Sequence, residues 1–204
     1  MLTLYGQVAS RAARNMWALA EMQVPYELHK VNQSTGESHT PEFMQVNPNG
    51  RVPALRDGDL VMFESRAINL YLAQKYGQGH LWPAGAQDQA RALMWSFWSQ
   101  NEVEIFVVDL LRHRFLYPPE KRKPELADAA IAALPKPLAV LDGALAGRQY
   151  LIGNCFTIAD LNVASVLGLG KIYKQLDMTP YGNINPWLER CLTRPAHEKV
   201  HAPA

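Results

Sequence analysis

The fold of this chain is decided by the stretch Asn47-Pro-Asn-Gly-Arg-Val-Pro-Ala-Leu-Arg-Asp-Gly-Asp-Leu-Val-Met-Phe-Glu-Ser65. A turn leads into a strand that has Pro53 near its beginning. Proline belongs at a strand start or a sheet edge, because it has no N–H to donate. The Asp57-Gly58 pair then forms a hairpin turn to a second, antiparallel strand, which runs directly into a helix start at Glu64-Ser65. The stretch therefore predicts a β-hairpin followed at once by a helix.

The same stretch has the features of a ligand site. A sheet edge with spare backbone groups can bind a short extended peptide by pairing with it. Glu64 and Ser65 add a carboxylate and a hydroxyl at a helix N-terminus, where free N–H groups favour an anion. These features describe a receptor for a small peptide-like molecule that carries an amine and a carboxylate. Glutathione fits that description.

Composition narrows the class of protein. The 204 residues are 48% hydrophobic and 19% charged with a formal net charge of +1, which is typical of a soluble globular protein. There is no basic stripe interleaved with aromatic residues, so nucleic acid is not an expected partner. No apolar run approaches the roughly 18 residues of a membrane span, and residues 1–6 do not resemble a signal peptide. We expect a cytoplasmic protein without a membrane partner.

Two halves of the chain have different hydrophobic periodicities. The first 78 residues alternate strand and helix signals in the order β-α-β-α-β-β-α, which predicts a thioredoxin-like domain with a four-stranded mixed sheet. The strand signals lie at residues 2–5, 25–31, 52–56 and 60–63, and helix signals begin at Ser10, Thr40 and Glu64.

The strand signal disappears after residue 84. One apolar stripe predicts a helix of about 28 residues through Leu111, and a second stripe continues through Pro135 and Pro137 as one kinked helix. Residues 158–169 are apolar on nearly every face, so that helix should be buried on all sides. The expected domains are therefore residues 1–78, a linker at 79–86, and an all-α domain at 87–204.

At this point the chain resembles the cytosolic glutathione S-transferase family, and the likeness covers essentially its whole length. Four motifs in the family's order and spacing carry the resemblance. They are Leu4-Tyr-Gly-Gln-Val-Ala-Ser-Arg-Ala-Ala-Arg14, Pro48-Asn-Gly-Arg-Val-Pro-Ala-Leu55, Glu64-Ser-Arg-Ala-Ile-Asn-Leu-Tyr-Leu72, and Phe156-Thr-Ile-Ala-Asp160 with Arg194-Pro-Ala196 downstream.

The resemblance implies how glutathione would be held. It implies a cis peptide between Val52 and Pro53, which aims the backbone N–H and C=O of Val52 at the cysteinyl unit. Glu64 and Ser65 would hold the γ-glutamyl amine and carboxylate. The glycyl end would lie near His39 and Arg51, although His39 also fits an exposed loop histidine.

Family members of this kind activate the thiol of glutathione. A free thiol with a pKa near 8.5 is only a few per cent ionised at neutral pH, and the thiolate is the nucleophile. Lowering that pKa by about two units requires roughly 2.7 kcal/mol of preference for the anion. A hydroxyl donor contributes about 1.5–3 kcal/mol and a helix N-terminus about 0.3–1 kcal/mol. One well-placed hydroxyl therefore suffices, without a general base.

Ser10 is the preferred donor, because it follows Gly6 by four residues at the start of the first helix. Its alternative role is that of a plain N-cap. Tyr5 is the rival, since other branches of the family use a tyrosine on the first strand. A one-step change of register would instead bring Gln7 or Arg11 to the sulfur.

Several residues argue against other chemistry. Branches that work through an enzyme thiol carry a cysteine near this place, but residues 1–50 contain none. Cys155 and Cys191 lack CxxC spacing and a companion histidine cluster, so we expect inert thiols, no metal, and no cofactor besides glutathione as co-substrate. Thr157 and Asp160 form a capping-box pattern, so Asp160 is expected to be structural rather than catalytic.

The electrophile would bind in the cleft between the two domains. Its expected neighbours come from the first loop and the long helix, and they are Gln7, Val8, Val107, Leu111, Arg112 and Phe115. The Arg112-His113-Arg114 run offers two interpretations, a cationic pocket for an acidic substrate or, in preference, a solvated helix end.

Three functions remain open on this sequence. The leading hypothesis is conjugation of glutathione to a small hydrophobic electrophile. A second is isomerisation, dehalogenation or ether cleavage at the same glutathione site. The third is a non-catalytic ligand carrier or interaction module of the same fold. The resemblance also implies a homodimer.

Overall fold

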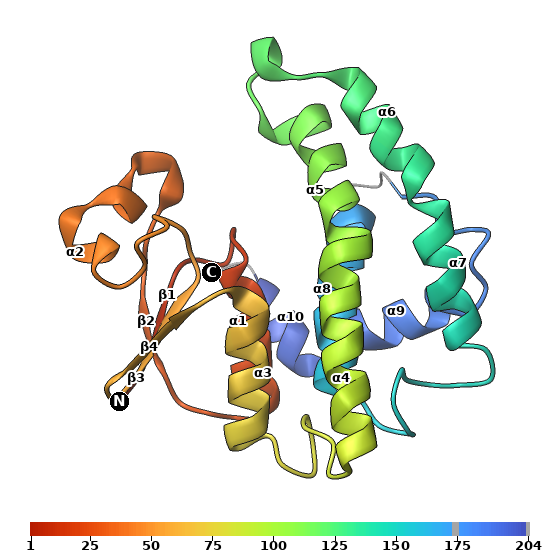
Figure 1. Cartoon of the computed structure of the whole chain (residues 1–204), viewed down its shortest axis with the longest axis horizontal. Coiled ribbons are helices and arrows are strands. Elements are labelled where there is room, and N and C mark those ends of the chain that lie inside the picture. The colour runs from red at the N-terminus through yellow and green to blue at the C-terminus, as the bar shows by residue number, and fades with distance from the viewer. Residues whose placement is uncertain (173–175, 203–204) are drawn as a thin grey trace. The chain divides into compact units, whose positions relative to one another are not determined.

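The structure is a computed structural model that describes residues 1–172 and 176–202, with no side-chain description for residues 170–172. It divides into two compact units (Figure 1). One, called here the first unit, comprises Met1–Ala84 together with the segment that begins at Arg194. The other, called the helical unit, comprises Gly85–Thr193.

The first unit contains the expected four-stranded mixed sheet. Its strands are β1 (Leu2–Tyr5), β2 (Glu27–His29), β3 (Ala54–Asp57) and β4 (Leu60–Phe63), in the spatial order β2-β1-β3-β4. β1 pairs in parallel with β2, with Thr3 opposite Glu27, and antiparallel with β3, with Leu4 opposite Leu55. β3 therefore lies inside the sheet. Of the two places expected for Pro53, a strand start or a sheet edge, the structure shows the strand start, because β3 begins at the next residue.

Helices cover both faces of this sheet. On one face, α1 (Ala12–Glu21) and α3 (Ser65–Tyr76) pack against alternate strand residues, and Leu4, Leu19, Leu55 and Ile68 are fully buried there. On the other face, the short helix α2 (Pro41–Met44) contributes Phe43 to a second cluster. The side chain of Thr40 caps α2 by accepting a hydrogen bond from the Phe43 N–H at 3.3 Å.

The limits of the first unit differ from the expected domain limits. Residues expected to form a linker are packed within it, since Leu81 is completely buried and the Trp82 N–H donates to the Gly77 carbonyl at 2.7 Å. The last helix, α10 (Pro195–His201), packs on α1 of the same unit. Arg194, just before α10, donates two hydrogen bonds to Glu21, at 2.6 and 2.7 Å. The helical unit therefore ends at Thr193, whereas the all-α domain was expected to extend to residue 204.

The helical unit begins with a long helical segment. α4 (Ala86–Trp98) continues through a π-helical stretch at Ser99–Glu104 into α5 (Ile105–Leu111), which ends in a second π-helical stretch at Arg112–Leu116. The helical segment from Ala86 to Leu116 is longer than the expected 28 residues. It contains one π-helical stretch in its interior and a second at its end.

In the described part of this unit, a short 3-10 helix (Pro119–Lys121) and four α-helices follow. α6 (Pro124–Ala133) and α7 (Pro135–Ala144) meet at Leu134, whose backbone stays helical, so the expected single helix is divided there by its prolines. α8 (Ile158–Ile172) is buried on nearly all sides through residue 168, as its composition predicted, and α9 (Ile184–Leu192) buries Trp187, Leu188 and Cys191. Within the described ranges, no helix is both long and apolar enough to cross a membrane.

Candidate active site

The loop between β1 and α1 brings a hydroxyl close to the loop that contains Pro53. Gly6 ends the strand with φ of +144°, and its N–H donates to the His29 carbonyl at 3.0 Å. A Cβ at Gly6 would lie 2.5 Å from the Cβ of Ala12, 3.4 Å from the Cβ of Val52 and 3.5 Å from the Oγ of Ser10. Gly6 is therefore the point at which the start of α1 and the residue before Pro53 approach each other.

The hydroxyl of Ser10 is already hydrogen-bonded within this loop. It donates to the Gln7 carbonyl at 2.7 Å and accepts from the Ala12 N–H at 3.2 Å. Ser10 thus bonds to the first residue of α1, Ala12, whereas the N-cap position itself is occupied by Arg11 and not by Ser10. The hydroxyl must break its hydrogen bond to the Gln7 carbonyl before it can donate to a ligand.

Tyr5 has a different environment from Ser10. Its ring lies 5.1 Å from that of His29 and 6.1 Å from that of Phe43, on the sheet face covered by α2. It packs against the cluster that contains Val52 and Ala54. Tyr5 therefore contributes to packing beneath the Pro53 loop.

The loop before Pro53 is shaped by a side chain that the sequence interpretation passed over. The Val52–Pro53 peptide is cis, as the family resemblance implied. Asn47 is 2% exposed, donates to the Arg51 carbonyl at 2.6 Å and accepts from the Asn49 N–H at 3.0 Å. Among the residues that the structure describes, none hydrogen-bonds to the backbone N–H or C=O of Val52. These groups therefore have no hydrogen-bond partner within the described part of the chain.

His39 and Arg51 lie at neighbouring places in this part of the first unit. A Cβ on Gly50 would be 2.8 Å from the Nε2 of His39, so this imidazole lies against the residue next to Arg51. Gly50 has φ of +61°, which together with that close approach favours glycine there. Both side chains are exposed, and a cation and an imidazole so placed can bind a carboxylate.

The start of α3 combines backbone strain with an anion-binding helix end. Glu64, just before the helix, has φ of +74°, a conformation that costs a non-glycine residue of the order of 1–3 kcal/mol. Ser65 is the first residue of α3 and is 4% exposed. Free N–H groups at this helix end favour a bound carboxylate. The exposed side chain of Glu64 adds an acceptor for an amine.

Asn15 is a second polar residue that sequence reasoning missed. It lies on α1 with no exposed surface, and its Nδ2 donates to the Ser65 carbonyl at 2.8 Å and to Asn69 Oδ1 at 2.7 Å. Asparagine in the middle of a helix has low helix propensity, and Asn15 directly precedes the apolar run Met16-Trp-Ala-Leu19. A polar residue of low helix propensity inside a predicted helix was the sequence signal that could have identified Asn15.

The residues expected to surround the electrophile differ in exposure. Val8 is 45% exposed and Phe115 is 41% exposed, whereas Val107 and Leu111 are buried, at 0% and 3%. Gln7 is half-buried, with its Nε2 3.5 Å from Asn32 Oδ1. A molecule could reach Val107 and Leu111 only after other side chains had moved.

The basic run at the end of α5 carries its own counter-charges. Arg112 lies 3.6 Å from the carboxylate of Asp109, and Arg114 forms a close ion pair with Asp128. His113 is nearly buried and accepts a hydrogen bond from the Lys123 N–H at 3.1 Å. These contacts favour a neutralised helix end over a cationic pocket.

Asp160 lies in the interior of the helical unit. Its carboxylate accepts four hydrogen bonds of 2.9–3.0 Å, from the N–H of Leu151, the N–H and hydroxyl of Thr157 and the indole N–H of Trp187. It has no exposed surface, and burial raises the pKa of its carboxyl group against the opposing effect of these donors. This is the arrangement of a structural cap.

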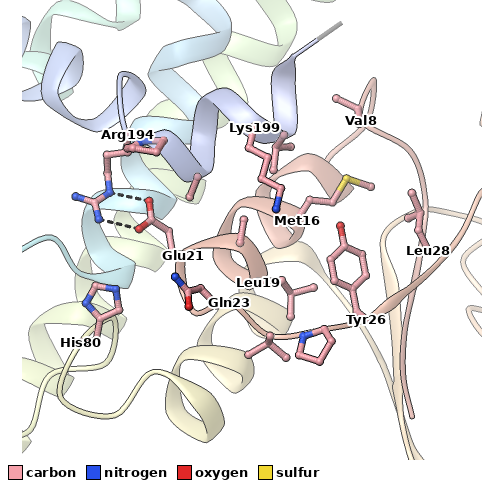
Figure 2. Close-up of a pocket in the computed structure, with 16 residues that line it drawn as sticks. Val8, Met16, Leu19, Glu21, Gln23, Tyr26, Leu28, His80, Arg194 and Lys199 are labelled. Atoms are coloured by element: carbon pink, nitrogen blue, oxygen red, sulfur yellow. Dashed lines mark hydrogen bonds and ion pairs between the residues drawn. The ribbon is translucent and has the colours of Figure 1, made fainter. Parts of the chain in front are cut away.

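A groove of about 1000 Å³ lies elsewhere in the first unit, along α1, the segment around β2, and α10 (Figure 2). Met16, Leu19 and Tyr26 contribute to its lining, and Lys199 reaches over it from α10 (Figure 2). Of the candidate site residues, Val8 alone lines it. Ser10, Val52 and Ser65 do not line this groove.

The thiols and possible metal ligands add little to the site. Cys155 is exposed and Cys191 is buried, and neither forms a disulfide. Over the described part of the chain, no three His, Cys, Asp or Glu side chains lie together in a way that could hold a metal ion.

Comparison with known proteins identifies the family. The glutathione S-transferase N-terminal domain matches residues 1–74, and the glutathione S-transferase C-terminal domain matches residues 106–195. Glutathione S-transferase GstB of Escherichia coli K12 is 32% identical over 203 residues, which cover 98% of this chain and 97% of GstB. The chain belongs to the glutathione S-transferase family.

Solved structures agree with this membership. The glutathione transferase URE2P5 from Phanerochaete chrysosporium has a TM-score of 0.88 at 28% identity, covering 98% of this chain and 92% of its own. The theta class glutathione S-transferase from Xanthomonas axonopodis pv. citri, solved with glutathione bound, has a TM-score of 0.87 at 29% identity. That alignment covers 100% of this chain and 98% of the Xanthomonas chain.

Proposed function

We propose that this protein conjugates the thiolate of glutathione to a small hydrophobic electrophile. The observation that carries the proposal is the approach at Gly6, where the Ser10 hydroxyl and Val52 both lie within 3.5 Å of one point. A cysteinyl unit paired with the Val52 backbone would bring its sulfur to this junction. The hydroxyl would then donate to the sulfur and stabilise the anion.

Each end of glutathione would have its own set of groups. The γ-glutamyl carboxylate would bind the N-terminus of α3 and the Ser65 hydroxyl, and Glu64 would accept from the γ-glutamyl amine. The glycyl carboxylate would lie near His39 and Arg51. Tyr5 remains the alternative donor to the sulfur, and Gln7 and Arg11 remain candidates from the same loop.

The thiolate can be formed without a base on the protein. If the Ser10 hydroxyl rotates so that it donates to a charged sulfur in place of the Gln7 carbonyl, a neutral hydrogen bond is replaced by a charge-assisted one. A charge-assisted hydrogen bond is roughly twice as strong. That gain favours the ionised thiol. The thiol proton would then leave to solvent.

The electrophile would contact the exposed candidates Val8 and Phe115 and the half-exposed Arg112, together with Gln7, which is next to Val8 in the sequence. The buried candidates Val107 and Leu111 would act through packing. Isomerisation, dehalogenation or ether cleavage at the same thiolate remains the alternative chemistry. A purely non-catalytic ligand carrier is disfavoured, because it needs neither the strained Glu64 nor the open Val52 backbone.

A homodimer is also proposed. Leu60, Val61 and Phe63 on β4 expose 38–42% of their surfaces, and β4 is an edge strand. On α4, Met94 and Phe97 are 53% and 56% exposed. Apolar patches of this kind mark interaction surfaces. Cytoplasmic location remains a prediction from the sequence, and a role in detoxification is proposed together with the conjugating activity.

Calorimetric titration of the purified protein with glutathione tests the proposal. We expect binding at about millimolar affinity or tighter, that is, at least about 4 kcal/mol. A Ser65→Ala variant should bind more weakly by about tenfold, since it loses a hydrogen bond to a charged group. Ser34→Ala, in an exposed turn, is the matched control and should bind as the parent does.

Conjugation is then measured with a panel of halogenated nitrobenzenes, epoxides and acidic aromatics. Product formation that requires glutathione supports the transferase function. Absence of any heat on titration would contradict the glutathione site and favour a scaffold protein. Binding without conjugation of any panel member would favour the alternative chemistries.

A further inference from the structure

Asn15 connects the two helices that carry opposite ends of the proposed glutathione site. Its Nδ2 donates to the carbonyl of Ser65, the first residue of α3, at 2.8 Å, and to Asn69 Oδ1 at 2.7 Å. Asn15 and Asn69 each have no exposed surface. Both Nδ2 protons are therefore used to join α1 to the beginning of α3.

The other end of this connection is Ser10. The Ser10 carbonyl accepts from the Ala13 N–H at 3.1 Å, and its hydroxyl accepts from the Ala12 N–H at 3.2 Å, so Ser10 is bonded to the first turn of α1. Asn15 lies in the same helix, and a helix is rigid over so short a distance. The position of Ser65 relative to Ser10 therefore depends on the Asn15 hydrogen bonds.

Packing alone does not require an amide here. The neighbouring residues that join α1 to α3 are apolar, among them Met16, Leu19, Ile68 and Leu72. Asn15 Oδ1 is buried and has no hydrogen-bond partner in the described part of the chain, so the amide carries a desolvation cost. An amide supplies direction, which an apolar contact does not, because hydrogen bonds weaken steeply with misalignment.

We propose that Asn15 is a positioning residue for catalysis, which holds the γ-glutamyl site at Ser65 in register with the thiolate donor Ser10. This inference rests on the proposed glutathione site. A bound glutathione molecule would extend from Ser65 to Ser10. A change in the distance between these two residues would therefore move the sulfur away from the Ser10 hydroxyl. Small misplacements of a reacting atom cost up to about a hundredfold in rate.

The test is an Asn15→Leu variant, which retains similar volume and removes both hydrogen bonds. Either end of glutathione can still bind, so we expect KM for glutathione to change less than about threefold while kcat falls about tenfold. The fraction of bound glutathione that is thiolate at neutral pH, measured by ultraviolet absorbance, should fall with kcat. Rates are corrected for the fraction of folded protein.

Asn162→Leu is the matched control. Asn162 is 1% exposed, lies on α8 of the helical unit and donates its Nδ2 to Ser96 Oγ at 2.9 Å. It should lose stability in the same way as Asn15→Leu, with an unchanged bound-thiolate fraction. Should Asn15→Leu fail to fold, Asn69→Ala removes one of the two hydrogen bonds and should lower kcat and the thiolate fraction by a smaller factor.

The outcomes separate this inference from the function on which it rests. If the parent binds glutathione and Asn15→Leu keeps the parental kcat and thiolate fraction, the positioning role is wrong and the glutathione site stands. If Asn15→Leu raises KM and leaves the thiolate fraction unchanged, Asn15 supports binding only, which also overturns the proposal. If the parent binds no glutathione, both proposals fail.

Discussion

At the scale of single residues, the hydroxyl of Ser10 donates one hydrogen bond and accepts two, from the N–H groups of Gln7 and Ala12. It serves the start of α1 through the Ala12 N–H and gives its proton to the Gln7 carbonyl. The acceptor function can persist while the donor function is transferred to a bound sulfur, because a hydroxyl has one proton and two lone pairs. A structural and a catalytic role are therefore compatible in this one side chain.

Replacing Ser10 by alanine separates these roles. We expect kcat to fall about 10- to 100-fold, which corresponds to the loss of about 1.5–3 kcal/mol of hydrogen bonding to the thiolate. The pKa of the bound thiol should rise, which the pH dependence of kcat/KM measures. The free energy of unfolding should also fall by about 0.5–2 kcal/mol through the lost cap.

Tyr5→Phe is the comparison for Ser10→Ala. Tyr5 packs against His29 and Phe43, and phenylalanine retains that packing, so activity should stay within about threefold of the parent. Full activity in Ser10→Ala together with loss of activity in Tyr5→Phe would assign the donor to Tyr5. The reaction class would be unaffected.

At the scale of secondary-structure elements, Asp57 ties the β3–β4 hairpin to α3. Its carboxylate accepts from Lys75 Nζ at 2.5 Å, from the Tyr71 hydroxyl at 2.8 Å and from the Tyr76 hydroxyl at 3.1 Å. The hydrogen bond from Lys75 is the largest cause that holds the pKa of Asp57 below its ordinary value. This hairpin precedes Glu64 directly, so the network also supports the proposed γ-glutamyl end.

The lowered pKa predicts how stability depends on pH. A carboxyl group with a lower pKa in the folded state than in the unfolded state stabilises the fold above the unfolded value of about 3.9. That contribution, of about 1 kcal/mol, is lost as the pH falls through the folded-state pKa. Urea unfolding at neutral pH and at about pH 3 measures it.

Asp57→Asn should remove this part of the acid sensitivity and lower stability at neutral pH. Asp59→Asn, at an exposed position of the same hairpin, is the control and should leave the pH dependence unchanged. An equal pH dependence in the parent and in Asp57→Asn would contradict the assignment.

A second element-scale anchor joins α8 to α9. Asp160 at the start of α8 accepts from the Trp187 indole of α9 and from Leu151 and Thr157, all at 2.9–3.0 Å. Asp160→Asn places an amide group where donors converge, so we expect unfolding free energy to fall by about 2–4 kcal/mol. Thermal unfolding measures the loss.

Asp128→Asn is the control for Asp160→Asn. Asp128 is 65% exposed and pairs with Arg114 at the surface, so its loss should cost less than about 1 kcal/mol. The KM for glutathione of folded Asp160→Asn should equal that of the parent. A raised KM without a stability loss would show that Asp160 acts at the site and would contradict the structural assignment.

At the scale of the whole molecule, the segment that begins at Arg194 belongs to the same compact unit as Met1–Ala84. The segment from Arg194 packs on α1 of the first unit, through the Glu21–Arg194 ion pair and the contact between the Trp17 and His197 rings at 4.6 Å. The first unit is therefore built from both ends of the sequence. Truncation before Arg194 would expose the side of α1 that α10 covers.

The proposed homodimer is tested at the same scale. Phe97→Glu puts a charge into the exposed apolar surface of α4, and burying an unpaired charge is costly, so the variant should be monomeric. Size-exclusion chromatography with light scattering gives the mass. Val140→Glu, at another exposed apolar position on α7, should leave the mass of the parent. A monomeric parent at about micromolar concentration would refute the dimer.

Local patterns were sufficient for much of this molecule. Strand and helix order, the Asp57-Gly58 hairpin and the Thr40 and Asp160 caps each depend on residues within a few positions of one another. Hydrophobic periodicity and turn-forming residues depend on such short-range interactions, so both can be recognised in the sequence. The motif at Ser10 and the Pro48–Leu55 stretch pointed to glutathione through their resemblance to the glutathione S-transferase family.

Contacts between distant residues could not be read in that way. The placement of β3 inside the sheet, the return of Arg194 to Glu21 and the bond from Asn15 to Ser65 join positions far apart in the chain. No periodicity records such a pair, because its energy arises only after the elements have packed. The packing of distant elements therefore decided how the start of α1, the Pro53 loop and the start of α3 are arranged in the proposed glutathione site.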